Sequence, residues 1–237
     1  MSSFLLKCIA MFTMVIDHLG NSIFEYTNFM NLIGRIAFPI FAFQISEGYL
    51  HTKNLKKYFF RLFLFALISQ VPFYLFRTLY TEGFALNIFF TLLLGLLAIF
   101  IYDKIINSDF DISKTFENTN MLFKYFLGLF IVVIIGIIAE LIKVDYGFFG
   151  ICIIFLFYMF KNNKLALIIS YLTVCIIKYG INIILYGFHY LYILLCLFTI
   201  LPIVFIILYN GKQGRKIKYL LYLFYPVHLL VLYFLFR

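Results

Sequence analysis

Charged residues are scarce in this sequence. Asp, Glu, Lys and Arg make up 12% of the 237 residues, against about 25% in a typical soluble domain. Hydrophobic residues make up 65%, against about 45–50% in soluble domains, and the mean hydropathy is +1.05. This composition excludes a soluble globular protein, a disordered chain and a secreted disulfide scaffold. It predicts one membrane domain with little mass outside the bilayer.

Cysteine is also rare, and its positions exclude two kinds of site. The four cysteines all lie within apolar segments and show no paired spacing, so they predict neither a zinc site nor a disulfide framework. They are interpreted as small buried hydrophobic residues, and no metal is expected. The residues concerned are Cys8, Cys152, Cys175 and Cys196.

Acidic residues are few, ten against nineteen Lys and Arg, which gives a net charge of +9. The basic residues follow the loops, and the 33 Phe and 19 Tyr lie inside apolar runs, so nucleic-acid binding is not expected. Asp17 and His18 interrupt the first apolar run and no small-residue cleavage site follows. The first run is therefore predicted to be a retained span rather than a signal peptide.

Nine apolar runs are candidate transmembrane helices, since a spanning helix needs about 20 mostly apolar residues. The runs are continuous rather than alternating, which favours an all-α bundle over a β-barrel. The sixth run is short for a full crossing. The predicted spans are 4–24, 30–50, 56–79, 86–104, 122–143, 147–160, 164–182, 188–209 and 216–236.

The distribution of Lys and Arg over short loops predicts the orientation of the chain. With the N-terminus in the cytoplasm, the cytoplasmic connections hold twelve of the nineteen basic residues, and the C-terminus lies outside. No linker divides the chain into domains, and no internal repeat supports an inverted-repeat transporter. The twelve residues are Lys53, Lys56, Lys57, Lys104, Lys114, Lys124, Lys161, Lys164, Lys212, Arg215, Lys216 and Lys218.

Polar residues within spans are costly, so each is a functional candidate. Lys7 and His18 are eleven residues apart, which places them on one face of the first span, about 16 Å apart along its axis. The side chain of Asp17 points about 100° away from His18, so Asp17 is not expected to orient the imidazole. The alternative interpretation is that Asp17 and His18 mark a helix end at the outer interface.

Later spans carry further polar residues at two depths. The second span holds Arg35 and Glu47, with a kink predicted at Pro39, and the last span holds His228 about halfway along its length. A stripe of Asn87, Thr91 and Gly95 is typical of helix packing. Glu140 and Asp145 flank an outer turn and are expected to be solvated. The predicted outer layer is Asp17, His18, Arg35, Lys178 and His228, and the predicted inner layer is Lys7, Glu47 and Arg61.

The two layers suit proton transfer beside a site for an anionic cytosolic compound. They also suit a proton-coupled small-solute transporter, and a structural assembly protein is a third possibility. Glycines such as Gly128 and Gly136 are expected to serve close packing within or between chains.

Ordered motifs along nearly the whole chain resemble the TraX family, named for the F-pilin acetylase of conjugative plasmids. The first motif runs from Lys7 to His18, and the last contains Phe224, Pro226 and His228. The motifs lie at 7–18, 34–43, 47–49, 52–54, 58–62, 68–73, 86–95, 145–147 and 224–229.

That family is similar to larger groups of membrane acyltransferases, which commonly carry a basic residue, ten intervening residues and a catalytic histidine on an early span. Lys7 and His18 have this spacing. The resemblance implies an acetyltransferase of the bacterial inner membrane with acetyl-CoA as co-substrate and a pilin-like protein, a glycan or a small molecule as acceptor. The implied catalytic residues are His18, as general base, with Asp17 and Arg35. The implied acetyl-CoA-binding residues are Lys7, Glu47, Arg61, Asn87, Thr91 and His228.

The sequence leaves two points of mechanism open. The donor to the oxyanion is Arg35, Asn87 or His228, and transfer is either direct or through an acetyl-histidine intermediate.

Overall fold

The computed structural model describes residues 1–24, 27–107, 117–215 and 218–237, and their regular elements are all helices. Eight helical segments within these ranges are long and apolar enough to cross a membrane, which confirms the all-α membrane fold. The helices are α1 (Ser3–Ile23), α2 (Phe29–Gly34), α3 (Ala37–His51), α4 (Leu55–Arg77), α5 (Ile88–Ile106), α6 (Glu117–Leu141), α7 (Gly147–Met159), α8 (Lys164–Tyr186), α9 (Tyr190–Ile200), α10 (Pro202–Ile207) and α11 (Lys218–Phe236).

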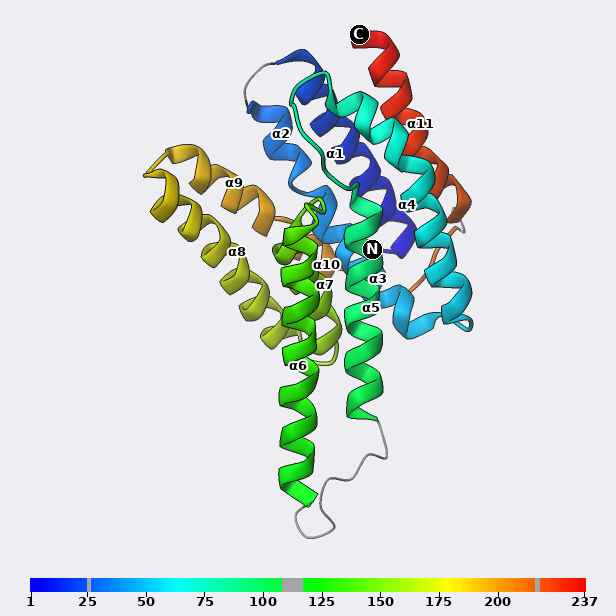
Figure 1. The fold of residues 1–237 in the computed structure, drawn as a ribbon, viewed down its shortest axis with the longest axis vertical. Helices are drawn as coiled ribbons and strands as arrows, with labels where there is room; N and C mark the ends of the chain where they lie inside the picture. Colours follow the sequence, from blue (N-terminus) through cyan, green and yellow to red (C-terminus); the bar gives the residue numbers. More distant parts are fainter. Residues whose placement is uncertain (25–26, 108–116, 216–217) are drawn as a thin grey trace.

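Polar residues between the apolar runs begin several helices. The side chains of Asn54, Asn87 and Asn163 each accept a hydrogen bond from a backbone N–H of the first turn of α4, α5 and α8. In Figure 1 the C-terminus of α11 lies at the top of the view, whereas α1 begins near mid-height and runs upward beside α4 and α11.

The predicted second span is two helices, because the chain breaks at Arg35 between α2 and α3. The break lies four residues before Pro39 rather than at Pro39, where the kink was predicted. A proline has no N–H and its ring clashes with the carbonyl four residues earlier, which is that of Arg35. Pro39 itself occupies the first turn of α3.

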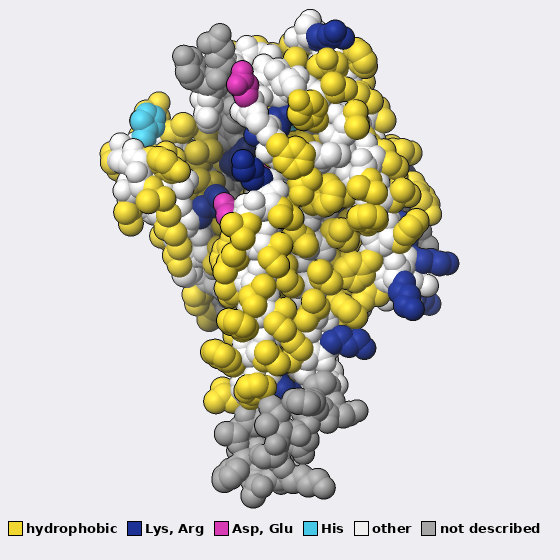
Figure 2. All heavy atoms as spheres, viewed as in Figure 1, with side chains coloured by type: hydrophobic (Ala, Val, Ile, Leu, Met, Phe, Trp, Pro, Cys, Tyr) yellow, Lys and Arg dark blue, Asp and Glu magenta, His cyan; other side chains and the backbone are white. Residues whose placement is uncertain are grey.

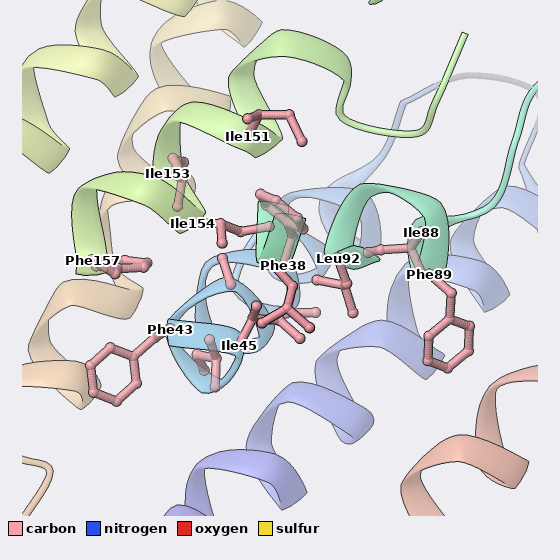
Figure 3. Packing of buried hydrophobic residues seen from close by; sticks show 14 of the residues in the cluster. Phe38, Phe43, Ile45, Ile88, Phe89, Leu92, Ile151, Ile153, Ile154 and Phe157 are labelled. Atoms are coloured by element: carbon pink, nitrogen blue, oxygen red, sulfur yellow. The ribbon is translucent and has the colours of Figure 1, made fainter. Parts of the chain in front are cut away.

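The sixth predicted span is the 13-residue helix α7, which is too short to be counted among the eight. Most of its side chains are buried, since it packs against α3, α5, α6 and α8. Figure 3 shows Phe38 of α3 between Ile151 and Ile154 of α7 and Leu92 of α5. Because protein surrounds α7, its length is not set by the thickness of the bilayer.

Glycines allow several helices to approach closely. A Cβ atom added at Gly128 would lie 2.7 Å from the Tyr102 ring, and one at Gly136 would lie 2.6 Å from the Phe148 ring. Both glycines of α6 therefore serve packing within the chain. Gly95 of the predicted stripe faces Ile154 in the same way, at 2.4 Å.

Apolar side chains cover most of the face seen in Figure 2, with basic side chains at its lower right, at the top and in a hollow towards the upper left. The N-terminal residues pair with the connection before α11, where the N–H of Ser3 donates to the Lys212 carbonyl at 2.9 Å. Near the same end, Asp103 accepts hydrogen bonds from the hydroxyls of Tyr49 and Tyr158, at 2.6 and 2.5 Å. These contacts close the end of the bundle that carries the predicted cytoplasmic loops.

Candidate active site

The histidines of the first and last spans are in direct contact. Nδ1 of His18 in α1 lies 2.7 Å from Nε2 of His228 in α11, although 210 residues separate them in sequence. Nδ1 of His228 lies 2.7 Å from the Phe224 carbonyl oxygen, one turn earlier in α11. The structure thus joins two residues of the predicted outer layer into a chain of hydrogen bonds.

Aromatic rings enclose this histidine pair. The His18 ring lies 5.1 Å from the Phe76 ring and 6.3 Å from the Tyr225 ring, between centroids. The Phe224 ring stacks on His228 with the ring centroids 4.9 Å apart, and His228 is buried, with an exposed fraction of 9%. The surroundings hold the rings in place and exclude most solvent.

Asp17 takes part in a different network from its neighbour His18. Its carboxylate accepts hydrogen bonds from Arg35 at 3.1 and 3.4 Å and from the Asn31 amide at 3.2 Å. The exposed fractions of the two charged side chains are 13% for Asp17 and 28% for Arg35. This ion pair ties α1 to the break between α2 and α3.

Gly34 makes that network possible. A Cβ atom added at Gly34 would lie 2.2 Å from the Cβ of Asp17, closer than any side chain can approach. The glycine of the Gly34-Arg35 pair therefore brings α2 against α1, and the arginine then reaches the carboxylate.

The turn before α7 folds against this ion pair instead of facing solvent as predicted. The Leu86 carbonyl accepts from the Asp145 N–H at 2.9 Å, and the Tyr146 ring stacks on Phe38 at 3.8 Å. Burial raises the pKa of the Asp145 carboxyl to about 6, and the positive charge of Arg35 opposes the rise. Glu140 is engaged too, since it accepts from the Phe148 N–H at 2.9 Å. The prediction of a solvated carboxylate is therefore wrong for Asp145, whereas Glu140 is exposed, as predicted.

A cavity of about 480 Å³ lies between α1, α3, α4, α5 and α11. All three residues of the predicted inner layer, Lys7, Glu47 and Arg61, line it. Lys53, between α3 and α4, and Gln213, before α11, line it as well. Its apolar part is lined by Met14, Phe89 and Tyr225. The structure therefore brings together the inner-layer residues that the sequence placed at one depth.

Two polar atoms in the cavity wall are buried without a hydrogen-bond partner among the described residues. They are Nε2 of Gln44 and Nε of Arg61. Neither Arg61 nor Lys7 forms an ion pair with a carboxylate in the described part of the chain, although Arg61 lies over the Tyr58 ring. Glu47 faces His51 at 3.8 Å. The wall therefore offers cations and N–H groups to a ligand that carries negative charge.

The cavity leads along two helix faces towards the histidine pair. Ser3, Lys7, Met11 and Met14 line it from one face of α1, and His18 is the next residue on that face. Leu221, Tyr222 and Tyr225 line it from α11, and His228 follows on the same face. The histidines themselves do not line the cavity but lie one turn beyond its apolar end.

Asn87 and Thr91 lie outside the cavity and hold the backbone. Both amide hydrogens of Asn87 are used, one by the Ala66 carbonyl at 2.7 Å and one by the Gln70 side chain at 2.8 Å. Thr91 donates to the Asp145 carbonyl, and both residues are 0% exposed. The structure therefore supports the packing interpretation of this stripe, and it leaves Asn87 no free N–H for an oxyanion.

Lys178, the remaining outer-layer residue, lies 4.5 Å from the centre of the Phe149 ring on α7. The sequence did not single out Gln44, Tyr222 or the Phe224 carbonyl. Phe224 belongs to the motif around His228, but nothing in the sequence indicated that its carbonyl contacts a histidine. Within the described ranges, no cluster of His, Cys, Asp and Glu could hold a metal ion.

Comparison with known proteins gives a consistent picture. The family model described as TraX protein matches residues 2–236. One curated protein, "Probable fimbrial assembly protein FimC, serogroup H1" of Dichelobacter nodosus, is 26% identical to this chain. The alignment is 255 residues long and covers 98% of this chain and 94% of that protein. No solved structure matches. Since the family model covers nearly the whole sequence, this chain is a member of the TraX family.

Proposed function

We propose that this chain is an integral-membrane acetyltransferase that moves an acetyl group from acetyl-CoA to an amine or hydroxyl acceptor, with His18 as general base. The observation that carries the proposal is that the cavity is lined along the face of α1 on which His18 lies. The cavity begins at cations that form no ion pair with a carboxylate in the described part of the chain. It continues along one face of α1 to an apolar end, and His18 is the next residue on that face.

The two parts of the cavity match the two parts of acetyl-CoA. Lys7, Lys53 and Arg61 provide positive charge for phosphate oxygens, with charge-assisted hydrogen bonds. The uncharged pantetheine arm fits the region towards Met14 and Tyr225, and Gln44 supplies a donor for its amides. Glu47 lies at the charged end of the cavity, beside His51. The volume of about 480 Å³ lies within the usual range of ligand pockets, roughly 300–1,000 Å³.

The chemistry requires one base and one donor to the oxyanion. The lone pair of the acceptor nitrogen or oxygen attacks the thioester carbonyl carbon, and His18 removes the proton from that acceptor atom. The tetrahedral intermediate then collapses, the carbon–sulfur bond breaks, and the protonated His18 returns the proton to the leaving thiolate. Asn87 is excluded as the oxyanion donor by its own hydrogen bonds. Both ring nitrogens of His228 are also engaged, so Arg35 is the remaining candidate donor.

The acceptor is expected on the outer side of His18, away from the basic end of the cavity. The printed name of the Dichelobacter relative refers to fimbrial assembly, which favours a pilin-like protein over a glycan or a small molecule. We place the enzyme in the bacterial inner membrane, because acetyl-CoA is cytosolic and the basic loops fit the cytoplasmic side.

Binding of acetyl-CoA to the purified protein tests the cavity. We expect isotope-labelled acetyl-CoA to bind in detergent or nanodiscs, and unlabelled CoA to compete with it. Lys57 is the matched control for the cavity cations, because it is exposed on α4 near the same end and does not line the cavity. Absence of binding at high protein concentration would refute the proposal.

A proton-coupled transporter is the second candidate, because buried ion pairs such as Asp17–Arg35 also occur in transport pathways. It predicts flux of a small solute in proteoliposomes that depends on Asp17 or Glu47. That flux would be indifferent to acetyl-CoA, whereas acetyl transfer would depend on it.

A further inference from the structure

We propose that His228 is a positioning residue, which together with the Phe224 carbonyl fixes the tautomer of His18 so that its proton is on Nδ1 and its lone pair is on Nε2. The inference deepens the proposed function and rests on it for its catalytic meaning. The tautomer itself is a property of the resting protein and is measured without any reaction.

The Phe224 carbonyl determines which nitrogen of His228 carries the hydrogen. A carbonyl oxygen can only accept a hydrogen bond, and it lies 2.7 Å from Nδ1 of His228. Nδ1 of His228 therefore carries a hydrogen. In a neutral imidazole, the other nitrogen, Nε2, is then an acceptor.

The contact between the His18 and His228 rings then determines which nitrogen of His18 carries the hydrogen. Nε2 of His228 lies 2.7 Å from Nδ1 of His18, the ring centroids are 5.0 Å apart and the ring planes differ by 10°. For two nitrogens at this distance, the centroids of the two rings are this far apart only when both nitrogens lie on the line that joins the centroids. The contact is therefore in the plane of both rings, as an N–H···N hydrogen bond requires, and the hydrogen is on Nδ1 of His18.

The surroundings favour two neutral rings. The carboxylate of Asp17 is engaged with Arg35 and Asn31 and contacts neither ring, and the rings beside the pair are those of Phe76, Phe224 and Tyr225. A positive charge here would be buried without a carboxylate partner and close to the Arg35 cation. The neutral pair with its two ordered hydrogen bonds avoids this cost.

The consequence is a directed base. Nδ1 of His18 is occupied by its bond to His228, so the free lone pair is on Nε2, where a general base needs it. When Nε2 takes a proton, Nδ1 continues to donate to His228, and a hydrogen bond from a charged donor is stronger than one from a neutral donor. His228 therefore orients the resting base and stabilises its protonated form.

The test is ¹⁵N spectroscopy of the full-length protein with labelled histidine, in which the four histidines are assigned by single substitutions. For the wild type we expect His18 to be protonated at Nδ1 and unprotonated at Nε2. His228→Phe keeps an aromatic ring but removes the acceptor, so the His18 signals should change to the other tautomer or to a mixture. His228→Gln, which retains an acceptor oxygen, should preserve the wild-type signals in part, and His189→Gln should leave them unchanged.

Kinetics give a second readout. We expect His228→Phe to lower kcat by about 10- to 100-fold, part of the roughly 10²–10⁴-fold that a general base supplies. The KM for acetyl-CoA should be unchanged, because His228 does not line the cavity. A wild-type His18 protonated at Nε2, or a tautomer unaffected by His228→Phe in a folded variant, would overturn the inference. Loss of the proposed function would instead appear as a correct tautomer in a protein without transferase activity.

Discussion

Met14 lies one helical turn before His18 on the same face of α1, and it lines the apolar end of the cavity that Lys7 begins. The three residues divide α1 into a charged entrance, an apolar passage and a candidate base. Asp17, one position from His18, faces the Arg35 guanidinium instead. Adjacent polar residues of one helix thus have different tasks, and each task leads to a different prediction.

The passage at Met14 is tested by enlarging its side chain. Met14→Phe should lower acetyl transfer at least tenfold, because the ring would fill the space through which the thioester approaches His18. Binding of CoA, which lacks the acetyl group, should change less than transfer. Steady-state kinetics and equilibrium binding check this, with Met159→Phe as a control at an exposed position of α7. Equal losses of binding and transfer would contradict a passage role.

The cavity cations should determine affinity. Lys7→Ala and Arg61→Ala should each weaken acetyl-CoA binding by about 10- to 100-fold, since a hydrogen bond to a charged group contributes about 1.5–3 kcal/mol. Equilibrium binding with labelled acetyl-CoA measures the change, and Lys57→Ala should bind as the wild type does. If Lys57→Ala weakens binding as much as Lys7→Ala, the attraction is a general effect of charge and not a site.

The Asp17–Arg35 ion pair should contribute to stability. Asp17→Asn leaves the Arg35 cation largely buried without its counter-charge, which should lower the free energy of unfolding by about 3 kcal/mol. Arg35→Gln in the same chain should restore part of this loss. Thermal unfolding in detergent measures both variants. An Asp17→Asn variant of wild-type stability that has lost only turnover would assign Asp17 to the chemistry.

These residues also show what the sequence could and could not predict. Hydropathy alone located all nine apolar segments, because exclusion of backbone polar groups from lipid leaves few alternatives to a helix. Depth along the spans was enough to group Lys7, Glu47 and Arg61, which do line one cavity. The break in the second span was misplaced because a proline disturbs the carbonyl four residues earlier, at Arg35.

Contacts between distant segments were beyond reach. No pattern within a single span relates His18 to His228, since their contact depends on the packing of the first helix against the last. Asn87 and Thr91 were assigned to acetyl-CoA binding by resemblance, yet their polar atoms bond to the protein. A polar stripe in a sequence does not reveal whether its hydrogen bonds are already satisfied.

Gly34 should tolerate no side chain. Gly34→Ala places a Cβ atom 2.2 Å from that of Asp17, so α2 must move away from α1 and the Asp17–Arg35 pair must lengthen. We expect a clear loss of thermal stability. Gly180 of α8 is the matched control, because nothing lies within 4 Å of a Cβ added there, and Gly180→Ala in a helix should stabilise by about 0.5–1 kcal/mol. Similar effects of the two substitutions would contradict the close approach.

Acetyl transfer by the purified protein in proteoliposomes tests the proposed activity itself. Isotope-labelled acetyl-CoA is supplied on the side of the basic loops and bacterial envelope extract on the other, and labelled acetyl groups are identified by mass spectrometry. We predict label on an amine or hydroxyl product with the wild type, and a loss of about 10²–10⁴-fold with His18→Gln, which should still bind acetyl-CoA. Absence of labelled product with the wild type, or undiminished labelling with His18→Gln, would contradict the account.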